Sequence, residues 1–221
     1  MKRVQLIIKI FIMLSALTYI SCTKKQATVV QPPIIQDKER INQYNTLDNL
    51  KEGLWYVDKW KSYAKQICDN SKGFDCSVLG EIYHERFYGY GSKAKRQEAV
   101  SLLNTSCEKQ DSRSCLKLGI LATQSDIPIV NSNDLFIKAH DIALKKCEQQ
   151  YIFDCMTLSL IYFEGYGSFE RDRERAKNLA RYSCDNGYAM ACIFLGTNAD
   201  NREELQTAHT KACKLGITTF C

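Results

Sequence analysis

Ten of the eleven cysteines form five pairs with seven residues between the two members. The pairs are Cys68 and Cys76, Cys107 and Cys115, Cys147 and Cys155, Cys184 and Cys192, and Cys213 and Cys221. Within one continuous α-helix this spacing would hold the two Cα atoms roughly 12 Å apart, beyond the ~7 Å limit for a disulfide. If the first cysteine ends one helix and the second begins an antiparallel helix, a turn of a few residues brings the sulfurs together. The spacing therefore favours a series of helical hairpins, each closed by one disulfide.

The pairs recur at the interval expected of a repeat protein. Their first cysteines lie 39, 40, 37 and 29 residues apart, which is typical of stacked supersecondary units. Counting back in fours from each first cysteine predicts one stripe along the first helix of each unit. The stripes are Trp60-Ala64-Cys68, Ala99-Leu103-Cys107, Ala139-Ala143-Cys147, Ala176-Ala180-Cys184 and Leu205-His209-Cys213. The alanines in them permit close helix packing.

The second helix of each unit has its own pattern. A leucine three residues after the second cysteine is followed by a small residue in four units: Leu79-Gly80, Leu118-Gly119, Leu158-Ser159 and Leu195-Gly196. We interpret the leucines as core and the small residues as close helix contacts, because each hairpin must bury one face against its neighbours. Gly-Tyr-Gly-Ser occurs at residues 89–92 and 165–168. No strand precedes either copy, so these glycines indicate helix C-caps and not phosphate-binding loops.

Three motifs together resemble the Sel-1-like repeat family, and within it the disulfide-rich Helicobacter cysteine-rich proteins. The motifs are Ala-x3-Ala-x3-Cys, Cys-x2-Leu-Gly and Tyr-x2-Gly-Tyr-Gly, within residues 54–221. The resemblance implies an all-α fold: an α/α solenoid, coiled as a right-handed superhelix, of about five helix-turn-helix repeats each closed by a disulfide. Two departures stand out, an irregular insertion at residues 125–134 and a fifth unit that ends at Cys221 and predicts a truncated cap.

The N-terminus predicts export. Three basic residues precede an uncharged run, residues 10–20, which suits the apolar part of a signal peptide and is too short for a spanning helix. Ser21-Cys22 resembles the end of a bacterial lipobox, which implies a lipidated Cys22, although Tyr19 departs from the usual leucine. The alternative is that Cys22 is removed with the leader or pairs between molecules.

These features give three segments. We expect a signal peptide at residues 1–21, a lipidated N-terminus and flexible tether at residues 22–45, and the repeat solenoid at residues 46–221. The tether is expected because the polar segment with Pro32 and Pro33 lacks helical periodicity. The location would be a bacterial periplasm or cell surface, with the lipid anchoring the protein to a membrane.

Charge and residue types narrow the partners. The whole chain has a formal charge of +5, and removing residues 1–21 leaves +2, so a nucleic-acid partner is not indicated. Zinc is the competing use of the cysteines, but it favours Cys-x2-4-Cys knuckles and reduced thiols. His84, His140 and His209 show no spacing typical of metal ligands. We therefore expect neither a metal nor a cofactor.

An enzymatic alternative enters through the resemblance, because some members of the cysteine-rich branch are described as penicillin-binding proteins or weak β-lactamases. Ser-x-x-Lys occurs at Ser62, Ser92 and Ser114, but Ser-Asp-Asn and Lys-Thr-Gly are absent from the sequence. Three copies on repeat helices are better explained by chance. No catalytic residue can be named from the sequence.

The leading interpretation is a non-enzymatic repeat scaffold that binds a protein, a peptide or a peptidoglycan-related cell-wall component. Solenoids typically bind through their concave surface. Aromatic residues outside the repeat stripes are candidate anchors for such a partner. They are Trp55, Tyr56, Phe87, Tyr88, Tyr90 and Tyr166.

Overall fold

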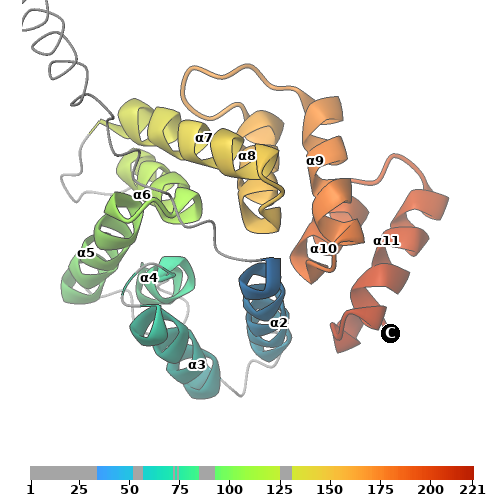
Figure 1. The fold of residues 1–221 in the computed structure, drawn as a ribbon, viewed down its shortest axis with the longest axis horizontal. Helices are drawn as coiled ribbons and strands as arrows, with labels where there is room; N and C mark the ends of the chain where they lie inside the picture. The colour runs from blue at the N-terminus through green and yellow to red at the C-terminus, as the bar shows by residue number, and fades with distance from the viewer. Residues whose placement is uncertain (1–33, 52–56, 72, 74, 85–92, 125–130) are drawn as a thin grey trace, which may run out of the picture. The chain divides into compact units, whose positions relative to one another are not determined.

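A computed structural model describes residues 34–51, 57–71, 73, 75–84, 93–124 and 131–221. These residues form α-helices, a C-terminal 3-10 helix and no strand. The helices are α2 (Ile34–Lys51), α3 (Val57–Asn70), α4 (Ser77–His84), α5 (Lys93–Glu108), α6 (Ser112–Gln124), α7 (Ser132–Glu148), α8 (Ile152–Glu164), α9 (Arg173–Asp185), α10 (Ala189–Thr197), α11 (Arg202–Lys214) and η3 (Thr218–Phe220). In Figure 1 the helices from α3 to α11 follow an arc, and α2 lies on its inner side.

Each cysteine pair closes one hairpin, as the spacing predicted. The disulfides link Cys68 to Cys76, Cys107 to Cys115, Cys147 to Cys155, Cys184 to Cys192, and Cys213 to Cys221. In chain order they close α3 with α4, α5 with α6, α7 with α8, α9 with α10 and α11 with η3, and their Cα atoms lie 4.5 to 5.1 Å apart. Such distances are normal for disulfides and need a reversal of the chain between the cysteines. The predicted all-α solenoid of disulfide-closed hairpins is confirmed.

Successive repeats pack through the predicted small residues. A Cβ at Gly80 would lie 2.7 Å from Leu103 of the next repeat, and one at Gly119 would lie 2.7 Å from Phe136. Ser159 takes the same place in the third repeat and donates its hydroxyl to the carbonyl of Ala176, 2.8 Å away. The second helix of a repeat therefore approaches the first helix of the next closely, with glycine or serine at the contact.

Helix ends follow the local sequence. The side chain of Asp172 accepts a hydrogen bond from the Arg175 amide at the start of α9, and Asn201 accepts one from the Glu204 amide at the start of α11. Gly165 ends α8 in the left-handed region, at φ 70°, which confirms the predicted C-cap. In the fifth unit the short 3-10 helix η3 follows α11.

The expectation of a tether up to residue 45 does not hold from Ile34 onward, where α2 begins. Its described side chains include Ile41 and Tyr44, which are buried against the repeats. Most of the stability of a helix in a protein comes from tertiary packing, so contacts with the repeats stabilise α2. Those contacts come from residues distant in sequence, and local composition could not reveal them. Residues 1–33, with Cys22, lie outside the described part of the chain.

Candidate protein-interaction site

Helix α2 lies against the turns that join the two helices of the first four repeats. Its side chains contact Asp75 in the first turn, Asp111 in the second, Phe153 at the start of α8 and the Gly187 backbone in the fourth turn. One helix is thus held by four consecutive repeats. We call this cluster the inner site: Arg40, Tyr44 and Asn45 from α2, with Asp75, Ser77, Asp111, Arg113, Phe153, Gly187, Tyr188 and Ala189 from the repeats.

The carboxylates of the inner site are placed by helix starts. Asp111 precedes α6, and its Oδ2 accepts hydrogen bonds from the Ser114 amide at 3.1 Å and the Ser114 hydroxyl at 2.5 Å. The hydroxyl of Ser106 donates to the same oxygen at 3.2 Å. Asp75 lies just before α4. Carboxylates are favoured at these positions because helix N-termini present free amides and a positive dipole end.

Arg40 bridges the two carboxylates. Its Nε donates to Asp75 Oδ2 at 2.8 Å and one terminal nitrogen donates to Asp75 Oδ1 at 3.0 Å, which makes a two-point contact. The same terminal nitrogen lies 3.4 Å from Asp111 Oδ1. The guanidinium carbon also lies 4.6 Å from the centre of the Phe153 ring. Arginine suits such a site because its planar fork matches a carboxylate and stacks on aromatic faces.

Tyr44 fills an aromatic slot one helical turn after Arg40. Its ring centre lies 4.6 Å from that of Phe153 and 6.5 Å from that of Tyr188. Its hydroxyl donates to Asp75 Oδ1, and the Arg113 guanidinium carbon lies 5.0 Å from its ring centre. The side chain is 1% exposed. A tyrosine with this burial and a satisfied hydroxyl is a typical anchor residue of a binding interface.

Asn45 connects α2 to the backbone of the fourth turn. Its Nδ2 donates to the carbonyl of Gly187 at 2.8 Å, and its Oδ1 accepts from the amide of Ala189 at 3.0 Å. One side-chain amide therefore satisfies a backbone carbonyl and a backbone amide. This pair of bonds fixes the position of α2 along the arc.

The buried carboxyl groups of Asp75, Asp111 and Asp154 have shifted pKa values. Burial would raise the pKa of Asp75, but the Arg40 charge outweighs it and holds that pKa below its ordinary value. Burial raises the pKa of Asp111, with Arg40 opposing the shift. Burial also raises the pKa of Asp154 to about 6, although its Oδ1 accepts a 2.6 Å hydrogen bond from Ser112. The Arg40 charge therefore favours the ionised forms of the Asp75 and Asp111 carboxyl groups.

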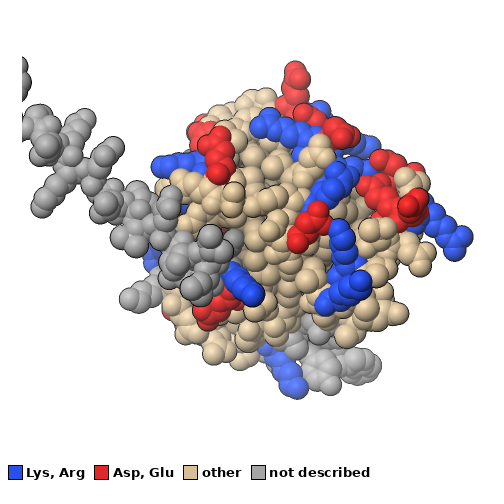
Figure 2. Space-filling view, turned by 45° about the vertical axis from the view of Figure 1, so that its right-hand side comes forward, with Lys and Arg blue, Asp and Glu red and all other residues tan. Residues whose placement is uncertain are grey.

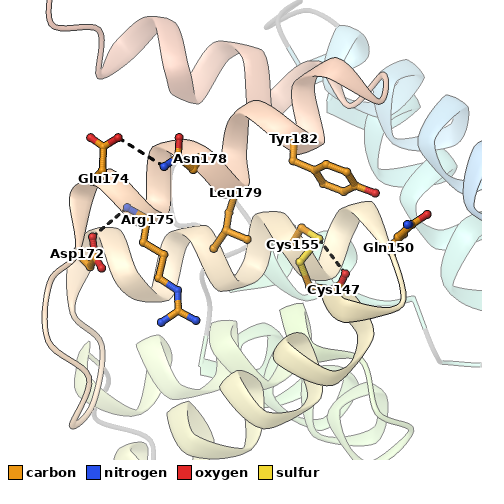
Figure 3. Close-up of a pocket in the computed structure, with 9 residues that line it drawn as sticks. All are labelled: Cys147, Gln150, Cys155, Asp172, Glu174, Arg175, Asn178, Leu179 and Tyr182. Atoms are coloured by element: carbon orange, nitrogen blue, oxygen red, sulfur yellow. Dashed lines mark hydrogen bonds between the residues drawn. A yellow bond between two sulfur atoms is a disulfide. The ribbon is translucent and has the colours of Figure 1, made fainter.

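A second surface is the α7–α9 groove, with a volume of about 560 Å³. Figure 3 shows Leu179 and Tyr182 of α9 beside the Cys147–Cys155 disulfide, and charged side chains at the start of α9. The residues lining the groove are Cys147, Gln150, Cys155, Asp172, Glu174, Arg175, Asn178, Leu179 and Tyr182. On the face shown in Figure 2, basic and acidic side chains are interspersed. A partner bound in the α7–α9 groove would meet the acidic side chains of Asp172 and Glu174 and the basic side chain of Arg175.

The two motif serines among the described residues, Ser62 and Ser114, lie in different repeats, on α3 and α6. Ser114 is buried, and its hydroxyl donates a hydrogen bond to Asp111, the residue that precedes α6 and also accepts one from the Ser114 amide. Ser62 is exposed on α3, and its partner in the motif, Lys65, is paired with Asp69 at 2.5 Å. Ser92 lies outside the described residues.

His140 and His209 contact aromatic residues. His140 Nε2 lies 2.9 Å from the Tyr162 hydroxyl, and its ring stacks on Phe169. His209 packs on Phe220 of the terminal cap, with ring centres 4.4 Å apart. In the part of the chain that is described, no group of three or more His, Cys, Asp or Glu side chains is arranged to hold a metal ion.

One of the predicted aromatic anchors is described. Tyr166 stacks on Phe136 of the same repeat, with ring centres 5.1 Å apart, and so contributes to packing. The other candidates fall in residues 52–56 and 85–92, outside the described ranges. The anchors that the sequence analysis missed are Arg40, Tyr44 and Asn45. The spacing of Ile34, Ile41 and Tyr44 could have indicated a helix there, because steps of seven and three residues return to one helical face.

No family model matches this chain. Over 157 residues it is 26% identical to cytochrome c oxidase assembly factor 7 from Xenopus tropicalis. The matched region covers 69% of this chain and 64% of the assembly factor, just under two thirds of its length. Among solved structures it is similar to a Sel1 repeat protein from Oxalobacter formigenes, with 17% identity and a TM-score of 0.40, over 86% of this chain and 78% of that one. It is also similar to c5321, a protective antigen of uropathogenic Escherichia coli with an SLR fold, with 20% identity and a TM-score of 0.43, over 80% of this chain and 38% of that one.

Proposed function

We propose that this protein is an exported, lipid-anchored repeat scaffold that binds a protein or peptide partner. The observation that carries the proposal is the inner site, where side chains from four consecutive repeats hold one helix. The site binds this helix through an arginine between two carboxylates, an aromatic slot, and hydrogen bonds to the backbone of the fourth turn. These are common ways in which a repeat surface recognises a polypeptide.

Export and anchoring are supported by the cysteines and by the N-terminal sequence. Five disulfides are in keeping with an oxidising compartment outside the cytoplasm. No helix among the described residues is long and apolar enough to span a bilayer. A Cys22→Ser variant should lose incorporation of labelled fatty acid and leave the membrane fraction. Retained labelling would contradict the anchor.

Partner binding can be tested by site-specific photo-crosslinking in intact cells. A photoreactive amino acid replaces Asn186, in the fourth turn beside the Asn45 contact, or Asn178 in the α7–α9 groove. Gln206, exposed on α11, is the control position. We expect a discrete protein adduct from Asn186 or Asn178 and none from Gln206. Equal labelling at all three positions, or at none, would contradict a specific partner surface.

A further inference from the structure

The buried carboxylates of the inner site require a positively charged group on the segment that occupies the site. Asp75 and Asp111 are 6% and 2% exposed, so their carboxylates lie in a largely dry environment. Of the two guanidinium groups near them, Arg113 belongs to α6 and stays with the repeats, whereas Arg40 is brought by α2. A buried carboxylate that loses its cation is strongly destabilised. Any segment that takes the place of α2 must therefore bring a positive group to the same point.

The remaining contacts fix the shape of the occupant. The tyrosine slot lies one helical turn from the arginine contact, and the backbone of the fourth turn binds the next residue, Asn45. Arginine and tyrosine at positions i and i+4 share one face of an α-helix, and asparagine at i+5 projects about 100° further around the helix axis, toward the fourth turn. The slot is formed by the rings of Phe153 and Tyr188, which pack against the Tyr44 ring. The site thus recognises a helix and not an extended strand.

Over residues 38–46, α2 buries fewer side chains than the repeat helix α8 does. Between residues 38 and 46, Ile41 and Tyr44 are buried, while Lys38, Glu39, Asn42 and Thr46 are exposed. By contrast, α8 buries an almost continuous run from Ile152 to Ile161. Segments with few buried apolar contacts and many polar ones open locally at lower free energy than the core. Helix α2 can therefore leave while the disulfide-closed repeats stay folded.

We propose that the inner site is a receptor for a partner helix that carries Arg-x3-Tyr-Asn, and that α2 occupies it in cis as a displaceable mimic. This proposal rests on the proposed scaffold function and names the chemistry of its partner. A partner then binds only by competing with α2, which is present at a high effective concentration because it is covalently attached. The contact of α2 with the repeats is thus autoinhibitory.

The test measures binding of a fluorescent peptide with the sequence of residues 34–51 to the full chain with its disulfides intact. The Tyr44→Ala protein has a weakened α2 and unchanged receptor residues, and Asn45→Ala is a milder version. Thr46→Ala is the matched control, because Thr46 is exposed and bonds within its own helix. Circular dichroism and a count of free thiols establish that each variant is folded.

We expect the Tyr44→Ala protein to bind the peptide at least ten-fold more tightly than the wild type or Thr46→Ala, with Asn45→Ala in between. A peptide with Arg40→Glu should lose binding to all of them. Absence of peptide binding to both folded variants, or equal binding to variants and wild type, would overturn the proposal. Concentration-dependent dimers of the chain that exchange α2 would also overturn it, by assigning the site to a second copy.

The two proposals fail separately. If crosslinking at Asn178 identifies a partner while the peptide never binds the variants, the scaffold function stands and the inner site is not its receptor. If the peptide binds as expected and no cellular adduct forms at Asn186 or Asn178, the receptor chemistry stands without a cellular partner.

Discussion

The contacts between repeats and the contacts of α2 hold the molecule by different means. Repeats meet through small and apolar residues, as where Gly80 contacts Leu103 and Gly119 contacts Phe136. Helix α2 meets the repeats through hydrogen bonds of an arginine, a tyrosine and an asparagine. The first kind of contact joins neighbouring repeats, and the second joins residues 31 to 144 positions apart. The difference separates a permanent scaffold from a segment that can be exchanged.

Removing an inter-repeat contact should have the largest effect on stability. Leu103 is fully buried against Gly80, so Leu103→Ala is expected to lower the free energy of unfolding by about 2–5 kcal/mol. Leu205 is 36% exposed on α11, and Leu205→Ala should cost less than about 1 kcal/mol. Urea unfolding followed by circular dichroism measures both. Equal losses of free energy of unfolding in Leu103→Ala and Leu205→Ala would contradict the assignment of Leu103 to the core and Leu205 to the surface.

The buried carboxyl group of Asp154 should make the free energy of unfolding depend on pH. Asp154 has a pKa of about 6 in the folded protein, above its ordinary value, because burial disfavours its charge. The folded state then binds this proton more tightly than the unfolded state, so stability falls as pH rises from about 4 to about 6. Asp154→Asn should remove that loss and raise the free energy of unfolding by up to about 3 kcal/mol at pH 7.5.

At pH 4 the same variant should gain little, because the wild-type carboxyl is already protonated when folded. Urea titrations at the two pH values measure the difference. A gain of the same size at both would show that the charge of Asp154 is not its cause.

One disulfide should contribute less than the best-packed leucine. By the chain-entropy model, a loop of about nine residues closed by Cys107 and Cys115 contributes about 2.5 kcal/mol. Replacing both cysteines with alanine should lower the stability of the oxidised protein by about that amount and leave its helix content unchanged. Loss of helicity before denaturant is added would show that the hairpins depend on their disulfides for folding.

The smallest effect is expected from the motif serines. Ser62→Ala and Ser114→Ala should leave any hydrolysis of nitrocefin by the oxidised protein essentially unchanged, and so should Ser92→Ala. A nucleophilic serine needs a base and an oxyanion site around it, and its loss removes several powers of ten in rate. Ser114 instead serves the start of α6 through Asp111. Loss of turnover in one folded variant would replace the scaffold interpretation by a hydrolase.

The two kinds of contact also differ in how far the sequence predicts them. Cysteine spacing and the alanine and glycine stripes predicted the hairpins and their close packing, because those contacts repeat with the period of the chain. Arg40, Tyr44 and Asn45 have no repeat and lie in a polar segment after Pro33. Their helix is stabilised by Asp75 and by the fourth turn, far along the chain, so local propensity could not reveal it.

Native-state hydrogen exchange tests the central claim most directly. Amides of residues 40–46 in α2 are compared with those of residues 155–162 in α8, in the wild-type chain with its disulfides intact. The account predicts that the α2 amides exchange at least ten-fold faster, through an opening that leaves α8 protected, and that excess peptide of residues 34–51 accelerates them further. Equal protection of both helices, lost in a single global transition, would contradict it, because α2 would then be a permanent part of the core.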